Sequence, residues 1–219
     1  MANDAVDHRG SCALLLSGGS TPRASYERLA TKYRDSVPWD RVHLFWGDER
    51  FVPSGDPRSN ARMAREALVD RVPCPPANVH PIPTELPSAD AAALRYDDLL
   101  RARFPGGVPR FDLVLLGLGD DAHTASIFPG SRALEEPARW VLAVTAPADP
   151  PQRITLTMPA LIAAARLFVL AAGAGKAAAL RRVIDPASDP TLYPAASLQR
   201  ARARVTWWVD RAAASQSVA

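Results

Sequence analysis

Three side chains that can exchange protons lie together in the middle of this sequence. Asp120, Asp121 and His123 follow a short apolar run at residues 113–116. A run this short, closed by glycine, is typical of a strand that is buried on both faces. We expect residues 124–127 to begin a short helical turn after it. Titratable groups outside the carboxyl end of such a strand lie where open α/β sheets bind their ligands.

His123 is the candidate general base. At the start of the predicted helical turn, it would face the positive end of the helix dipole, which disfavours the imidazolium form. A neutral imidazole can take a proton from water near pH 7. Asp121 can accept a hydrogen bond from one ring nitrogen and leave the other free. The alternative is that His123 only caps a helix or completes a turn, but the surrounding glycines and aspartates favour a functional role.

A predicted strand-to-helix turn near the N-terminus has the composition of a phosphate site. The strand is expected at residues 13–16 and the helix at residues 22–34, which begins with proline. Glycines let the backbone approach a ligand, and hydroxyls lie beside the free N–H groups of a helix N-terminus. The residues expected to hold the phosphate are Ser17, Gly18, Gly19, Ser20 and Thr21. The alternative is an ordinary glycine turn with a helix cap.

Charged residues also follow two further predicted strands. Asp48 and Arg50 come directly after the strand expected at residues 42–46, and Lys176 comes shortly after the strand expected at residues 167–171. Charged residues in these positions can simply be solvated, and a lone lysine in a first helical turn usually is. After buried strands they are well placed to line a cleft, because the carboxyl ends of parallel strands meet at one edge.

Strands and helices alternate along the chain, which predicts an α/β fold with a single domain. The sheet is expected to be mainly parallel and Rossmann-like, with helices on both faces. Residues 1–12 are expected to be a disordered or short N-terminal segment, and residues 13–219 to form the domain. The remaining helices are expected at residues 59–69, 88–104 and 159–165, and the remaining extended segments at residues 140–144, 153–158 and 205–209.

Composition excludes several classes of protein. The 219 residues are 47% hydrophobic and 22% charged, with a net charge of +3 spread along the chain, so no nucleic-acid partner is expected. Cys12 and Cys74 have no metal-site spacing. No apolar run approaches the roughly 18 residues that would span a bilayer, so no membrane partner is expected. The N-terminus lacks the apolar core of a signal peptide, and we expect a cytoplasmic protein.

Taken together and in order, these motifs resemble those of the 6-phosphogluconolactonase family, within the wider glucosamine-6-phosphate deaminase-like group. The resemblance covers about residues 13–212. Each motif is weak alone, but the ordered set is specific. The matching motifs are SGGSTP (17–22), WGDERFVP (46–53), SN (59–60), GLGDDAHTASIFPG (117–130), RITLT (153–157), GAGK (173–176) and WWVD (207–210).

The resemblance implies hydrolysis of 6-phospho-D-glucono-1,5-lactone to 6-phospho-D-gluconate, a step of the pentose phosphate pathway. It implies an enzyme without metal or cofactor whose partner is a small phosphosugar lactone, and we expect a monomer. It implies that His123, Asp121 and Arg50 are catalytic. The residues expected around the substrate are the Ser17–Thr21 loop, Asp48, Arg153 and Lys176.

One departure and three rival functions accompany this resemblance. The family motif has glycine where this chain has Ala122, and a positive φ there would add strain of about 1 kcal/mol. The nearest rival is a glucosamine-6-phosphate isomerase/deaminase with Asp48 as the base, although the Gly-Asp-Glu-Arg sequence and the Phe128–Pro129 ending favour the lactonase. The second rival is a non-catalytic regulator that binds phosphosugars. The third rival, a dinucleotide-binding domain, has weaker support, because no G-x-G-x-x-G motif follows the first predicted strand.

Overall fold

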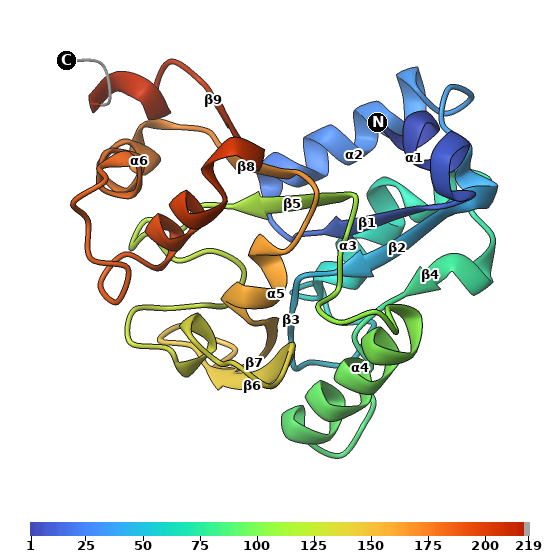
Figure 1. The fold of residues 1–219 in the computed structure, drawn as a ribbon, viewed down its shortest axis with the longest axis horizontal. Coiled ribbons are helices and arrows are strands. Elements are labelled where there is room, and N and C mark those ends of the chain that lie inside the picture. Colours follow the sequence, from blue (N-terminus) through green and yellow to red (C-terminus); the bar gives the residue numbers. More distant parts are fainter. Residues whose placement is uncertain (217–219) are drawn as a thin grey trace.

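The larger of two sheets has six parallel strands. In the computed structural model, which describes residues 1–216, the strand order is β4-β2-β1-β5-β8-β9 (Figure 1). From β1 the chain adds β2 and β4 on one side, and it then returns to add β5, β8 and β9 on the other side. The topological switch point of the sheet therefore lies between β1 and β5. The strands are β1 (Cys12–Leu16), β2 (Val42–Trp46), β4 (Val79–His80), β5 (Leu113–Gly117), β8 (Leu167–Ala171) and β9 (Val205–Val209).

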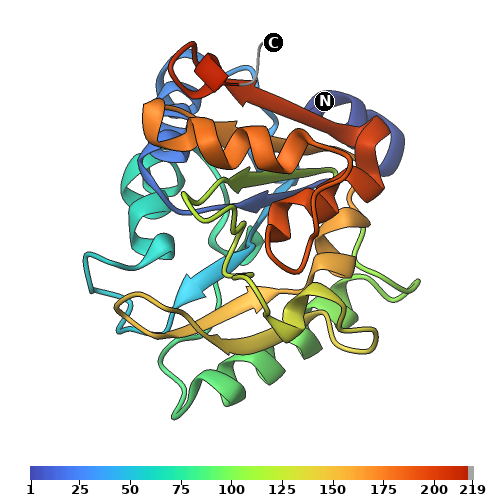
Figure 2. The same ribbon diagram turned by 90° about the vertical axis from the view of Figure 1, so that its left-hand side faces the viewer.

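Helices cover both faces of this sheet, as the alternating sequence predicts. Figure 1 shows α2 above the sheet and α4 below it, and Figure 2 shows the same layers after a quarter turn. The predicted α/β fold is therefore confirmed. The α-helices are α1 (Ala2–Arg9), α2 (Ser20–Lys32), α3 (Asn60–Ala67), α4 (Ala89–Arg103), α5 (Met158–Ile162) and α6 (Ala177–Ile184). The 3₁₀ segments are Trp39–Arg41, Val69–Arg71, Pro76–Asn78, Arg132–Leu134, Ala174–Lys176, Pro194–Arg204 and Ala213–Gln216.

The N-terminal segment begins with a helix. Helix α1 buries Ala5 and ends at Gly10, whose φ of 77° gives it the left-handed conformation of a helix C-cap. Arg9 forms an ion pair with Asp112, which stands just before β5. Strand β1 then begins at Cys12. No helix among residues 1–216 is both long and apolar enough to cross a membrane.

A second, antiparallel sheet was not foreseen from the sequence. It pairs β3 (Asp48–Arg50) with β7 (Gln152–Leu156), which pairs in turn with β6 (Val141–Thr145). Gly47 still donates its N–H to the carbonyl of Leu16 at 2.9 Å, and the chain then leaves the larger sheet. In the ladder, Arg50 lies opposite Arg153. Since side chains alternate along a strand, Asp48 and Arg50 share one face and Glu49 points to the other.

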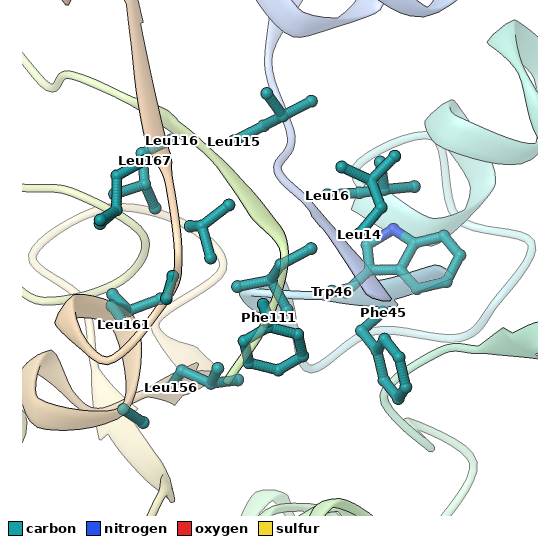
Figure 3. Close-up of a cluster of buried hydrophobic side chains, with 14 of the residues drawn as sticks. Leu14, Leu16, Phe45, Trp46, Phe111, Leu115, Leu116, Leu156, Leu161 and Leu167 are labelled. Carbon is teal, nitrogen blue, oxygen red and sulfur yellow. The ribbon is translucent and has the colours of Figure 1, made fainter. Parts of the chain in front are cut away.

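Apolar packing and two buried tyrosines fix the carboxyl ends of β1 and β2. Figure 3 shows leucines of β1 and β5 packed with Phe45, Trp46 and Phe111. The hydroxyl of Tyr26, from α2, accepts from the Ser17 N–H and donates to the Ser17 carbonyl, both at 2.9 Å. Tyr96, from α4, bonds the backbone of Trp46 in the same way. Each tyrosine thereby locks the residue from which a site loop departs.

Candidate active site

A cleft of about 460 Å³ lies where the carboxyl ends of β1, β5 and β8 meet the face of β3 and β7. The predicted site residues that line it are Ser17, Gly18, Gly19, Ser20, Thr21, Asp48, Arg50, His123, Arg153 and Lys176. Asp121 lies behind His123 and does not line the cleft. Predicted site residues from five separate segments are therefore gathered at the switch point of the larger sheet.

His123 is held on three sides. Its Nδ1 lies 2.5 Å from Oδ1 of Asp121, and its ring is 4.6 Å from the ring of Phe128, measured between centroids. The third side is Gly119, where an added Cβ would lie only 2.0 Å from Nδ1 of His123. Burial alone would raise the pKa of Asp121, but hydrogen bonds from the His123 N–H and ring hold it below its usual value. With Nδ1 engaged, Nε2 is the nitrogen left to exchange protons.

The predicted helical turn after His123 is wrong. Residues 124–127 form an isolated antiparallel bridge between Thr124 and Ile127, and Ala122 and Ala125 adopt positive φ values of 64° and 50°. The Ile127 N–H donates to the Thr124 carbonyl at 3.0 Å and closes a turn, and Thr124 Oγ1 donates to the Gly117 carbonyl at 2.9 Å. The helix-dipole argument for His123 therefore does not apply. Ala122 has the positive φ at which alanine adds strain.

The predicted phosphate loop runs into the 13-residue helix α2, which begins at Ser20 rather than at the predicted residue 22, so Ser20 and Thr21 lie in its first turn. Gly19 is its N-cap, with a φ of 103° that glycine adopts without strain. Ser17 is 5% exposed, and among the described residues its Oγ has no hydrogen-bond partner. Gly18 packs directly on Asn60, because an added Cβ would lie 1.9 Å from Oδ1 of Asn60. The loop thus combines a helix N-terminus with a buried hydroxyl that a ligand could satisfy.

Two adjacent carboxylates on β3 have different surroundings. Asp48 faces the cleft, accepts from Ser126 Oγ at 2.7 Å and from Asn60 Nδ2 at 3.3 Å, and is 7% exposed. Glu49 points away and caps α3, accepting the N–H groups of Asn60 and Ala61 at 2.7 Å each. Burial raises the pKa of Glu49, and these N–H groups act in the opposite direction. Glu49 therefore anchors β3 to α3, and Asp48 is the carboxylate that can meet a ligand.

Two arginines face each other across the β3–β7 ladder. Arg50 Nη1 donates to the Arg58 carbonyl at 2.5 Å, and Arg153 Nε donates to the Pro150 carbonyl at 2.7 Å. Burial, and then the charge of Arg50, lower the pKa of Arg153. Nε of Arg50 is buried and has no partner within residues 1–216. Like charges directly opposite in a ladder are unfavourable, so this pair fits an anionic ligand.

Lys176 approaches the cleft from the end of β8. Its Nζ lies 2.7 Å from Oδ1 of Asp120, which follows the neighbouring strand β5. The Asp120 side chain is 76% exposed and that of Lys176 is 29% exposed. A surface ion pair of this kind is weak, so the ammonium can be given up to a ligand phosphate.

Several cleft residues escaped the sequence prediction. Asn60, Ser126, Phe128 and Asp149 line the cleft but were not assigned a role. Three of them lie inside motifs quoted for the resemblance, so a signal existed for Asn60, Ser126 and Phe128. Asp149 lies in a proline-rich loop and gave none. Within residues 1–216, no group of three or more His, Cys, Asp or Glu side chains is placed to hold a metal ion.

The fold and cleft define an α/β protein of doubly wound topology whose site suits a small phosphorylated substrate. The chain belongs to the glucosamine-6-phosphate isomerase/6-phosphogluconolactonase family, whose model matches residues 1–207. A 6-phosphogluconolactonase of Synechocystis is 42% identical over 212 residues, which cover 95% of this chain and 86% of the relative. One from Streptomyces coelicolor is 41% identical over 223 residues, covering 97% and 85%. The solved structure of 6-phosphogluconolactonase from Trypanosoma cruzi matches with a TM-score of 0.87 and 31% identity, covering 100% of this chain and 89% of that one.

Proposed function

We propose that this chain hydrolyses 6-phospho-D-glucono-1,5-lactone to 6-phospho-D-gluconate, with His123 activating the attacking water. The observation that carries the mechanism is the Asp121–His123 pair at the edge of a cleft lined by cationic groups. The activity is that of the 6-phosphogluconolactonases to which the chain is related at about 40% identity. The reaction belongs to the pentose phosphate pathway.

The phosphate is held by the Ser17–Thr21 loop, Arg153 and Lys176. The N–H groups at the start of α2 and the free Oγ of Ser17 suit phosphate oxygens. Arg153 adds a guanidinium, and Lys176 exchanges Asp120 for the phosphate. Asp48, fixed by Ser126 and Asn60, accepts hydrogen bonds from hydroxyls of the sugar ring.

The chemical step is a proton transfer coupled to attack on a carbonyl. Nε2 of His123 takes a proton from water while the water oxygen forms a bond to the lactone carbonyl carbon. Asp121 keeps the other ring nitrogen engaged and stabilises the imidazolium that forms. When the tetrahedral intermediate collapses, the bond from that carbon to the ring oxygen breaks, and His123 returns the proton to the ring oxygen. Such general-base catalysis contributes roughly 10²- to 10⁴-fold in rate.

Arg50 stabilises the developing oxyanion. Its buried Nε has no partner among residues 1–216 and is available to a substrate oxygen. The Arg58 carbonyl fixes its Nη1. A preorganised donor of this kind contributes about 3–4 kcal/mol to the transition state. Loss of Arg50 should therefore lower kcat more than it raises KM.

The test compares wild-type protein with His123→Ala in the hydrolysis of freshly made lactone. His123 lies at the cleft and outside the buried core, so the variant should keep its fold and lose at least about 100-fold in kcat. Near-normal turnover by the variant would refute the base assignment. Ammonia release from glucosamine 6-phosphate would instead indicate the deaminase, and tight phosphosugar binding without turnover would indicate the regulator.

A further inference from the structure

We propose that Arg58 and Asp149 form a clasp that positions Arg50 and Arg153 for the substrate, an inference that rests on the function proposed above. The clasp is the ion pair between Nη1 of Arg58 and Oδ2 of Asp149, 2.7 Å apart. It joins the loop after β3 to the loop before β7. Neither residue belongs to the catalytic set assigned above.

The first loop holds Arg58 rigidly. Oδ1 of Asp56 accepts the Arg58 N–H at 2.8 Å and its Nε at 3.0 Å, and Oδ2 accepts Nη2 at 2.8 Å. A two-pronged contact between guanidinium and carboxylate fixes the plane of the arginine. The backbone carbonyl of Arg58 accepts a hydrogen bond from Nη1 of Arg50 at 2.5 Å. The placement of Arg58 therefore sets the placement of the Arg50 guanidinium.

The second loop carries the partner arginine. The Ala146 N–H donates to the Pro151 carbonyl at 2.7 Å and closes this loop at its base. Pro150 follows Asp149 in the sequence, and its carbonyl accepts a hydrogen bond from Nε of Arg153 at 2.7 Å. The contacts thus run in a closed path from Arg50 through Arg58 and Asp149 to Arg153.

The arginine pair needs such a constraint because its members repel each other. Arg50 lies directly opposite Arg153 in the ladder, and its charge contributes to the lowered pKa of Arg153. Without a ligand between them, the two guanidinium groups gain by separating. A clasp that prevents separation removes an ordering cost from substrate binding. The clasp therefore acts on substrate affinity through Arg153 and on the transition state through Arg50, and Arg58 and Asp149 are positioning residues.

A purely stabilising role can be distinguished from this one. The side chains of Arg58 and Asp149 are 47% and 80% exposed, and exposed ion pairs contribute little to stability. Arg23 is a matched control, since its side chain is 48% exposed and lies near two carboxylates, Glu27 and Glu66. It does not line the cleft.

The experiment measures KM, kcat and Tm for Arg58→Ala, Asp149→Asn, their double variant and Arg23→Ala. Each clasp variant should raise KM roughly two- to fivefold through Arg153 and lower kcat by a similar factor through Arg50, the range that loss of an exposed ion pair permits. The double variant should be as impaired as the worse single variant, because both substitutions remove the same contact. Tm should change no more than in Arg23→Ala, whose KM stays at the wild-type value.

Two results would overturn the clasp. One is a wild-type KM together with a wild-type kcat in both single variants. The other is restoration of KM when Asp149→Asn is added to Arg58→Ala, which would mean that Arg58 only neutralises a carboxylate near the phosphate. If the wild-type protein shows no lactone turnover, the proposed function fails separately. The clasp is then tested by calorimetric binding of 6-phosphogluconate, whose Kd should rise in the same variants and whose constancy would reject it.

Discussion

Replacing Gly119 with alanine is expected to displace His123 without unfolding the protein. Gly119 has no positive φ, so its backbone accepts alanine. The added Cβ would lie 2.0 Å from Nδ1 and 2.3 Å from Cε1 of His123, and 2.7 Å from Oδ1 of Asp121. Since ordinary contacts begin near 3.4 Å, the ring must move by about 1.4 Å. That movement breaks the 2.5 Å contact between His123 and Asp121.

The magnitude follows from this displacement. A misplacement of about 1 Å in a catalytic group can cost about 100-fold in rate, which corresponds to about 2.7 kcal/mol of transition-state stabilisation. We therefore expect kcat of Gly119→Ala to fall about 100-fold. KM should change little, because the phosphate loop, Arg153 and Lys176 are untouched.

The assay follows lactone decay against the spontaneous background, with Tm as a check on folding. Gly175→Ala is the matched control, because its Cβ would meet its nearest neighbour, Oδ1 of Asp120, at 3.9 Å. That distance is an ordinary contact, so Gly175→Ala should keep kcat near the wild-type value. A folded Gly119→Ala protein with wild-type kcat would show that the Asp121–His123 contact does not matter for turnover.

Two further predictions concern stability. Ala122→Gly should shift Tm by less than about 2 °C, because relief of about 1 kcal/mol of strain at φ 64° is offset by the loss of a buried methyl group worth about 0.8 kcal/mol. A rise of several degrees would contradict this balance. Burial, then the charges of Arg103 and His80, lower the pKa of His43 from 6.5 to about 4. The contribution of neutral His43 to the free energy of unfolding is therefore fully present above about pH 6.5, and it is lost as the pH falls toward 4. His43→Gln should reduce the loss of Tm between pH 7 and pH 5, and an unchanged loss would reject this cause.

Most strands of the larger sheet could be predicted because their signals are local, whereas the two-residue strand β4 (Val79–His80) was not predicted. The run at residues 42–46 matches β2 and the run at residues 167–171 matches β8. Each run is apolar on both sides because helices or the second sheet cover both faces. Ser88 is the N-cap of α4, and its Oγ accepts the Ala91 N–H at 3.1 Å, as its position before an apolar-periodic segment indicates.

The remaining features depend on contacts distant in sequence. Strand β3 consists of Asp48, Glu49 and Arg50, and so has no apolar pattern. It is a strand only because β7, about 100 residues later, supplies its partner. The turn after His123 fails as a helix because Ser126 bonds Asp48, 78 residues away. Tertiary contacts override local preference at both places, and both lie in the cleft.

In the candidate site too, residues with local sequence signals could be predicted, and residues that depend on long-range contacts could not. Glycine, hydroxyl and charged residues at strand ends indicated the loop at 17–21, Arg50, His123 and Lys176, all of which line the cleft. Asn60 lies in a motif quoted for the resemblance but was given no role, because its contacts with Gly18 and Asp48 form only in the folded chain. The Arg58–Asp149 ion pair likewise joins residues 91 apart.

The most direct test of the account is the rate of 6-phosphogluconolactone hydrolysis with wild-type protein and with His123→Ala, each measured above the spontaneous rate. The proposed mechanism predicts a wild-type rate well above background and a loss of at least about 100-fold in the variant, with Tm nearly unchanged. Background-level hydrolysis by the folded wild-type protein, or full turnover by the folded variant, would contradict it.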